Sequence, residues 1–74
     1  MELLKPLIKE KRLCRVLMND IELDGWLAVD INTTHYIICE TTTRWSCWVV
    51  PKMLLNSFMR QFYRRAEKFE VTCP

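Results

Sequence analysis

The chain has 74 residues, of which half are apolar and 27% are charged, and its formal net charge is +2. At this length residues 1–74 form a single domain, which buries only about 60% of the surface that the unfolded chain exposes. The longest uninterrupted apolar runs have four or five residues, far fewer than the roughly 20 that cross a bilayer, which excludes a membrane-spanning helix.

The first predicted element is a short amphipathic helix over Glu2–Arg12. Its apolar residues recur at helical spacing, namely Leu3, Leu4, Leu7 and Ile8. Its last turn carries three positive charges, Lys9, Lys11 and Arg12. These charges either complement the negative end of the helix dipole or contact the phosphates of a nucleic acid.

The next part of the chain alternates with period two and is rich in β-branched and aromatic residues, which predicts four antiparallel strands joined by short turns. We expect these strands at Leu13–Met18, Asp20–Ile31, His35–Glu40 and Trp45–Val50. The dipeptide Asn19-Asp20 tolerates positive φ and predicts a tight turn.

The second strand has the clearest alternation. One face is expected to be buried, with Ile21, Leu23, Leu27, Val29 and Ile31. The other face is expected to be an acidic outer face, with Asp20, Glu22, Asp24, Trp26, Ala28 and Asp30. Gly25, the only glycine of the chain, predicts a bend, a bulge or a close backbone approach, so the sheet is expected to be strongly bent there.

After Pro51 the apolar period becomes 3.6, which predicts a C-terminal helix on the sheet. Its apolar arc comprises Leu54, Leu55, Phe58, Met59, Phe62, Ala66 and Phe69. Arg60, Arg64 and Lys68 form a basic stripe on the other side, either an ordinary solvated face or a phosphate-binding surface. A fifth strand followed by a helix is an alternative for this segment, and residues 71–74 are expected to fray. The predicted fold class is α+β.

The four cysteines, Cys14, Cys39, Cys47 and Cys73, would pair as two disulfides in a secreted mini-protein. The first residues lack the apolar stretch of a signal peptide, so we interpret the cysteines as thiols and expect a cytoplasmic protein. No closely spaced cysteine pair occurs and His35 is the only histidine, so neither a metal site nor a cofactor is expected. The chain also lacks a nucleophile motif and a Gly-rich loop, so we do not expect an enzyme.

The segment Val16–Leu27 resembles the first Sm motif of Sm-like RNA-binding proteins, and Leu4–Arg12 is similar to the N-terminal helix of the bacterial Hfq branch. The resemblance covers about residues 3–40 and implies a small, strongly bent barrel-like sheet, ring oligomers and single-stranded RNA held by loop residues around a pore. His35 stands where the family often has an asparagine before an apolar strand. The chain departs from the pattern at Asp20, which replaces a turn glycine, and the second Sm motif has no counterpart.

Two functions are therefore expected. The first is binding of single-stranded RNA or another nucleic acid by a homo-oligomer, through Lys9, Lys11, Arg12, His35, Arg44, Arg60, Arg64 and Lys68, with Trp26, Tyr36 and Tyr63 as candidates for base stacking. The second is protein–protein interaction, as a small regulator or inhibitor of a host protein. Its interface would use the acidic strand face and the tryptophans Trp26, Trp45 and Trp48.

Overall fold

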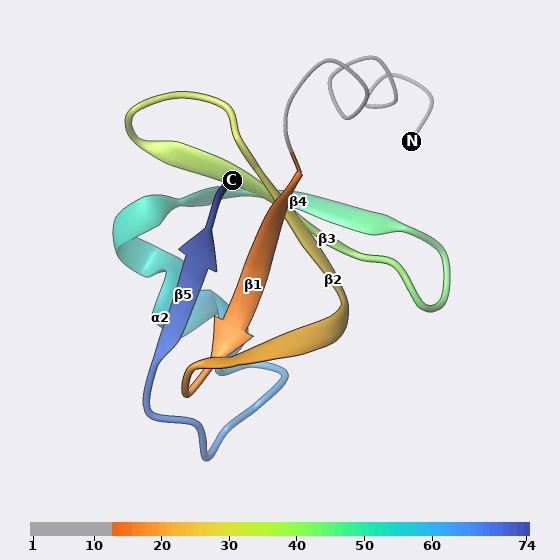
Figure 1. The fold of residues 1–74 in the computed structure, drawn as a ribbon, viewed down its shortest axis with the longest axis vertical. Coiled ribbons are helices and arrows are strands. Elements are labelled where there is room, and N and C mark those ends of the chain that lie inside the picture. Colours follow the sequence, from red (N-terminus) through yellow and green to blue (C-terminus); the bar gives the residue numbers. More distant parts are fainter. Residues whose placement is uncertain (1–12) are drawn as a thin grey trace.

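The computed structural model describes residues 13–74, which form a five-stranded antiparallel sheet with a short helical segment (Figure 1). In chain order the elements are β1 (Cys14–Met18), β2 (Ile21–Asp30), β3 (His35–Glu40), β4 (Ser46–Pro51), the 3-10 helix η2 (Lys52–Leu54), α2 (Leu55–Met59) and β5 (Phe69–Thr72). The strand order across the sheet is β4-β3-β2-β1-β5, so β4 and β5 lie at its two edges. Of the helices formed by residues 13–74, none has the length and apolar character needed to cross a membrane.

The prediction of four strands and a C-terminal helix is wrong. α2 ends at Met59, residues 60–68 form turns, and β5 then pairs with β1 along its whole length. The apolar positions after Pro51 do fit a helical period, but a strand at this place satisfies the hydrogen-bonding edge of β1, which a helix would leave unpaired. The observed order, a helical segment and then a fifth strand, also reverses the alternative considered above. The helix predicted over Glu2–Arg12 lies outside the described residues.

The predicted turn between the first two strands is confirmed. Asn19 and Asp20 have φ of 48° and 70°, and Met18 pairs with Ile21 across the turn, as in the two-residue hairpins that match the twist of a sheet. Asn19 also fixes the start of β5, because its N–H donates to the carbonyl of Lys68 at 2.9 Å and its Oδ1 accepts from the Lys68 N–H at 3.0 Å.

The irregularity predicted at Gly25 is present. Arg15 pairs with Leu27 and Leu17 pairs with Glu22, so β2 residues 23–26 face a single residue of β1. Gly25 has a φ of 85°, a conformation that costs glycine little and other residues more. In Figure 1, β2 curves from its hairpin with β1 round to its pairing with β3.

The predicted faces of β2 are wrong on both sides of this bend. Trp26 and Ala28, expected on the outer face, are 5% and 0% exposed and belong to the main core, whereas Ile21, expected inside, is 71% exposed. Val29, next to Ala28, is buried in a second apolar cluster on the opposite side of the strand. Because this half of β2 is buried on both sides, period-two alternation could not identify its core face.

The main core lies between one face of the curved sheet and α2. Its buried members are Cys14, Val16, Trp26, Ala28, Ile38, Val50, Leu55, Met59 and Phe69. Every strand contributes to this list. A helix as short as α2 has little stability of its own, and the buried side chains of Leu55 and Met59 hold it in place.

The prediction of free thiols is also wrong, because Cys14 is bonded to Cys73 and Cys39 to Cys47. Cys39 and Cys47 are direct register partners on β3 and β4. Cys73 directly follows β5, and its neighbour Thr72 pairs with the neighbour of Cys14. The Cα atoms of the two bonded pairs are 4.3 and 4.1 Å apart. The cysteines were interpreted as thiols because the first residues lack the apolar stretch of a signal peptide, and that feature carries no information on which cysteines meet in the fold.

Candidate functional site

The basic stripe predicted on a C-terminal helix does not form, because the chain leaves α2 at Met59. The guanidinium of Arg60 turns back to its own chain, where Nη2 donates to the carbonyl of Glu67 at 2.9 Å and Nε to that of Ala66 at 3.4 Å. Arg60 therefore closes the loop after α2.

Lys68 is also engaged within the chain. Its ammonium lies 2.8 Å from the carboxylate of Glu70 and 3.4 Å from that of Asp20. Glu70 and then Asp20 hold the pKa of Lys68 above its ordinary value. Of the three stripe residues only Arg64 is exposed without an ion pair or hydrogen bond among the described residues.

The other predicted nucleic-acid contacts are scattered. Arg44 lies exposed in the loop between β3 and β4. Lys9, Lys11 and Arg12 lie outside the described residues. The structure therefore brings no continuous basic surface together from the predicted residues in 13–74.

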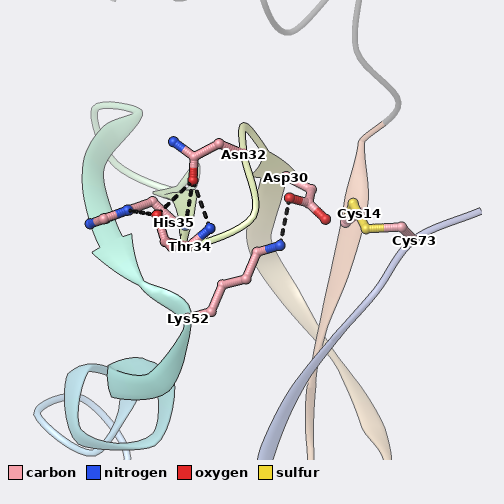
Figure 2. A network of polar contacts seen from close by, with 7 residues as sticks. All are labelled: Cys14, Asp30, Asn32, Thr34, His35, Lys52 and Cys73. Carbon is pink, nitrogen blue, oxygen red and sulfur yellow. Dashed lines mark hydrogen bonds and ion pairs between the residues drawn. A yellow bond between two sulfur atoms is a disulfide. The ribbon is translucent and has the colours of Figure 1, made fainter.

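His35 belongs to a polar network at the turn between β2 and β3 (Figure 2). Asn32 Oδ1 accepts from the N–H groups of Thr34 and His35 at 2.8 and 2.7 Å and from the Thr34 hydroxyl at 3.0 Å. The Thr34 hydroxyl also lies 2.7 Å from His35 Nδ1 and shares a hydrogen bond with it. These bonds define the turn.

Lys52 connects this turn to the start of the helical segment (Figure 2). Its Nζ lies 2.8 Å from the Asp30 carboxylate and 5.0 Å from the centre of the Tyr36 ring, and its N–H donates to the Thr34 carbonyl at 2.8 Å. Lys52 therefore has its charge partner within the molecule.

The loop between β3 and β4 is organised by Glu40. Its carboxylate accepts from the Thr42 N–H at 2.8 Å, from the Thr42 hydroxyl and from the Thr43 hydroxyl at 3.0 Å. The loop ends at Trp45, which has a φ of 54° and is 37% exposed. An aromatic residue in this left-handed region is strained, so the tryptophan is held there at a cost in backbone energy.

Trp26, predicted as an interface residue, is part of the core. Its indole N–H donates to the Tyr63 hydroxyl at 2.9 Å, and its ring lies 5.0 Å from that of Phe62. Trp48 lies over this group at the molecular surface, with its ring centre 5.8 Å from Phe62 and 6.3 Å from Trp26. Trp48 and Phe62 remain 37% and 45% exposed, so the aromatic cluster opens to solvent beside β4.

Large apolar side chains are exposed around the edge strand. We call the β4 apolar surface the group Trp48, Val49, Met53, Leu54 and Phe62. Val49 and Met53 are the most open of them, 63% and 89% exposed. Val49 and Leu54 also line a hollow of about 230 Å³ beside Phe58.

Charge is almost absent from this region. Between Trp45 and Met59 the only charged residue is Lys52, and its charge is paired with Asp30. Exposed apolar patches rimmed by polar residues mark binding sites, and the cores of protein interfaces are depleted in charge and enriched in aromatic residues and Met.

Sequence reasoning identified Trp48 but missed the rest of the surface, because Leu54 and Phe62 were assigned to the buried arc of a long helix. A usable signal was present in the segment Trp45–Val50, which is apolar at successive positions and carries no charge. Such a strand is either buried on both faces or exposed at an edge.

Within residues 13–74 no group of three or more His, Cys, Asp or Glu side chains is placed to hold a metal ion. Comparison of the chain with protein-family models, curated proteins and solved structures finds no match.

Proposed function

We propose that this protein is a non-catalytic protein-interaction module, and that its binding surface is the β4 apolar surface. The occupant is a polypeptide that supplies an extended, largely apolar strand to the open edge of β4. The observation that carries the proposal is the exposure of Trp48 and Val49, neighbouring residues on opposite faces of the edge strand, in a segment whose one charge is already paired.

Nucleic-acid binding needs several free cations on one surface. Arg60 and Lys68 are held by contacts within the chain, and Lys52, the only charged residue of segment 45–59, is paired with Asp30. These features favour a polypeptide over RNA as the partner. RNA binding is the outcome that would replace this proposal in the experiment below.

Peptides selected from a displayed random library on the immobilised protein test the proposal. We expect the selected peptides to alternate apolar residues and to bind the wild type but not Val49→Lys, which puts a charge at the exposed edge. Ile21→Lys is the matched control, since Ile21 is similarly exposed at 71% and lies in the β1–β2 hairpin. In parallel, fluorescent single-stranded RNA is titrated at several salt concentrations. Salt-dependent RNA binding that Arg64→Gln weakens, without any selected peptide, would overturn the proposal.

The disulfides bear on where the protein works. The cytoplasmic location and the free thiols were both expected because the first residues lack the apolar stretch of a signal peptide, whereas disulfides persist in oxidising environments. We propose that the functional form is the oxidised protein, in an environment that maintains both bonds. Alkylation of the protein from its natural source before reduction, followed by mass measurement, tests this: no alkylated cysteine is expected, and alkylation of all four would restore the cytoplasmic prediction.

A further inference from the structure

We propose that the strand that covers β4 comes from a second copy of this chain, so that two sheets join through antiparallel pairing of β4 with β4. The inference rests on the function proposed above and names its occupant. It follows from the difference between the two sheet edges, from the position of the exposed side chains and from the symmetry of the edge.

The two edges of the sheet are built differently. At the β5 edge the strand has four residues, carries Glu70 and is preceded by Lys68, whose ammonium lies 2.8 Å from Glu70. Short edge strands and charged side chains are the usual protection against pairing with another chain. β4 has six residues, none of them charged, and only Pro51 at its end lacks an N–H. Within residues 13–74, one edge is therefore protected, and no strand pairs with the outer side of β4.

The side chains at the open edge show what shape of partner fits. Trp48 pairs with Ile38, a main-core residue, and so lies on the core side of the sheet. Val49 pairs with Ile37, a member of the second cluster, and lies on the opposite side. A helix or a flat surface packed on one face would cover only one of the two. A strand in the plane of the sheet covers both and satisfies the outward N–H and C=O groups of β4.

The edge is compatible with its own copy. Two identical strands can pair antiparallel about a two-fold axis. In such a pair, residues that stand opposite each other lie on the same side of the sheet. Such a pair is centred on one residue that stands opposite itself, and the registers centred on Trp48 or on Val49 pair the largest part of β4. Like charges opposite each other would forbid such a pair, but residues 45–51 contain none. Cross-strand aromatic and β-branched pairs instead stabilise it.

Sedimentation equilibrium over a range of concentrations tests the proposal on the intact, oxidised chain. We expect a reversible monomer–dimer equilibrium, in which Val49→Lys raises the dissociation constant by about a hundredfold because each copy then brings a positive charge into an otherwise uncharged interface. Ile21→Lys is expected to leave the constant unchanged. Val49→Thr, which keeps a β-branched side chain without a charge, is expected to have a small effect and shows that the strand itself tolerates substitution.

Amide hydrogen exchange distinguishes β4 pairing from another dimer. Alternate β4 amides are expected to gain protection at concentrations where the dimer forms, and the β5 amides are not. A dimer that Val49→Lys leaves intact, or protection that appears at β5 instead, would overturn the inference. A protein that stays monomeric while selected peptides still require Val49 would also overturn it, and would leave the proposed function standing with a foreign strand as occupant.

Discussion

The indole N–H of Trp26 donates to the hydroxyl oxygen of Tyr63 over 2.9 Å, which joins the centre of β2 to the turn that follows α2. Trp26 is 5% exposed, so its side chain is largely screened from water and Tyr63 serves as the acceptor for its N–H. The bond therefore fixes the position of the 60–68 turns over the core, in the place where the sequence predicted a continuous helix.

Replacing Tyr63 by Phe is expected to lower the free energy of unfolding by about 1–3 kcal/mol, because the Trp26 N–H is left buried without an acceptor. Urea denaturation followed by tryptophan fluorescence measures the change. Tyr36→Phe is the control, since its hydroxyl has no hydrogen bond among residues 13–74, and we expect it to change stability by less than about 0.5 kcal/mol. Equal effects of the two variants would show that the bond contributes nothing.

Gly25→Ala is expected to destabilise the fold by more than about 1 kcal/mol, the approximate cost of a left-handed conformation for a residue with a Cβ. An additional cost is steric, because the new Cβ would lie 2.5 Å from Thr42 Cγ2. Thr42→Ser removes this methyl group and keeps the hydroxyl that donates to Glu40.

The double variant Gly25→Ala/Thr42→Ser is therefore expected to recover the steric part of the loss and not the conformational part. Thermal unfolding of the wild type, both single variants and the double variant measures the coupling. A Gly25→Ala protein as stable as the wild type would mean that β2 does not need the bend.

Loss of the Cys14–Cys73 bond is expected to cost more stability than loss of the Cys39–Cys47 bond. The bonded residues are 59 and 8 positions apart, and the entropy of closing these loops in the unfolded chain corresponds to about 4 and about 2.5 kcal/mol. Urea unfolding of Cys14→Ala/Cys73→Ala and Cys39→Ala/Cys47→Ala gives the two values. Addition of a thiol reductant to the wild type should produce a loss at least as large as the first, and no loss on reduction would contradict the prediction.

The acid side of the stability profile is expected to depend on Glu40. The Thr42 hydroxyl and N–H, and then Thr43, donate to its carboxylate and lower the pKa of Glu40 below its ordinary value of 4.5. The folded state thus binds fewer protons than the unfolded state in this range. The contribution is present above pH 4.5 and is lost as the pH falls through the lowered pKa.

Unfolding free energies measured between neutral and acidic pH test this dependence. Glu40→Gln is expected to flatten the profile below the ordinary pKa of a glutamate. Glu67→Gln is the control, because no residue of 13–74 makes a hydrogen bond or ion pair with its carboxylate. Identical acid profiles for Glu40→Gln and the wild type would exclude a role for the loop contacts.

Local patterns predicted the local parts of the fold. The turn at Asn19-Asp20, the strand His35–Glu40 and the irregularity at Gly25 depend on neighbouring residues, and each is found. The prediction failed for the C-terminal half of the chain. The apolar residues there, such as Phe62 and Phe69, fit one continuous helix as well as they fit a short helix followed by turns and a strand. Only pairing with β1, about 50 residues away in the chain, decides between them.

The candidate site was only partly predictable for the same reason. Trp48 was recognised from its residue type, whereas the exposure of Val49 depends on β4 being the last strand of the sheet. Strand order is a property of long-range pairing, and the uncharged apolar pattern of Trp45–Val50 alone leaves a buried strand and an edge strand as alternatives. Arg60, Arg64 and Lys68 do not form the predicted basic stripe, because the long helix that would align them does not form.

The Cys39–Cys47 bond fastens the open edge strand to its neighbour along the sheet. An edge strand that is anchored in this way cannot separate from β3, so it gives up little conformational freedom when another strand pairs with it. In a variant without this bond, Cys39→Ala/Cys47→Ala, β4 would be held to β3 by the strand pairing alone, and pairing with another strand would cost it more conformational freedom.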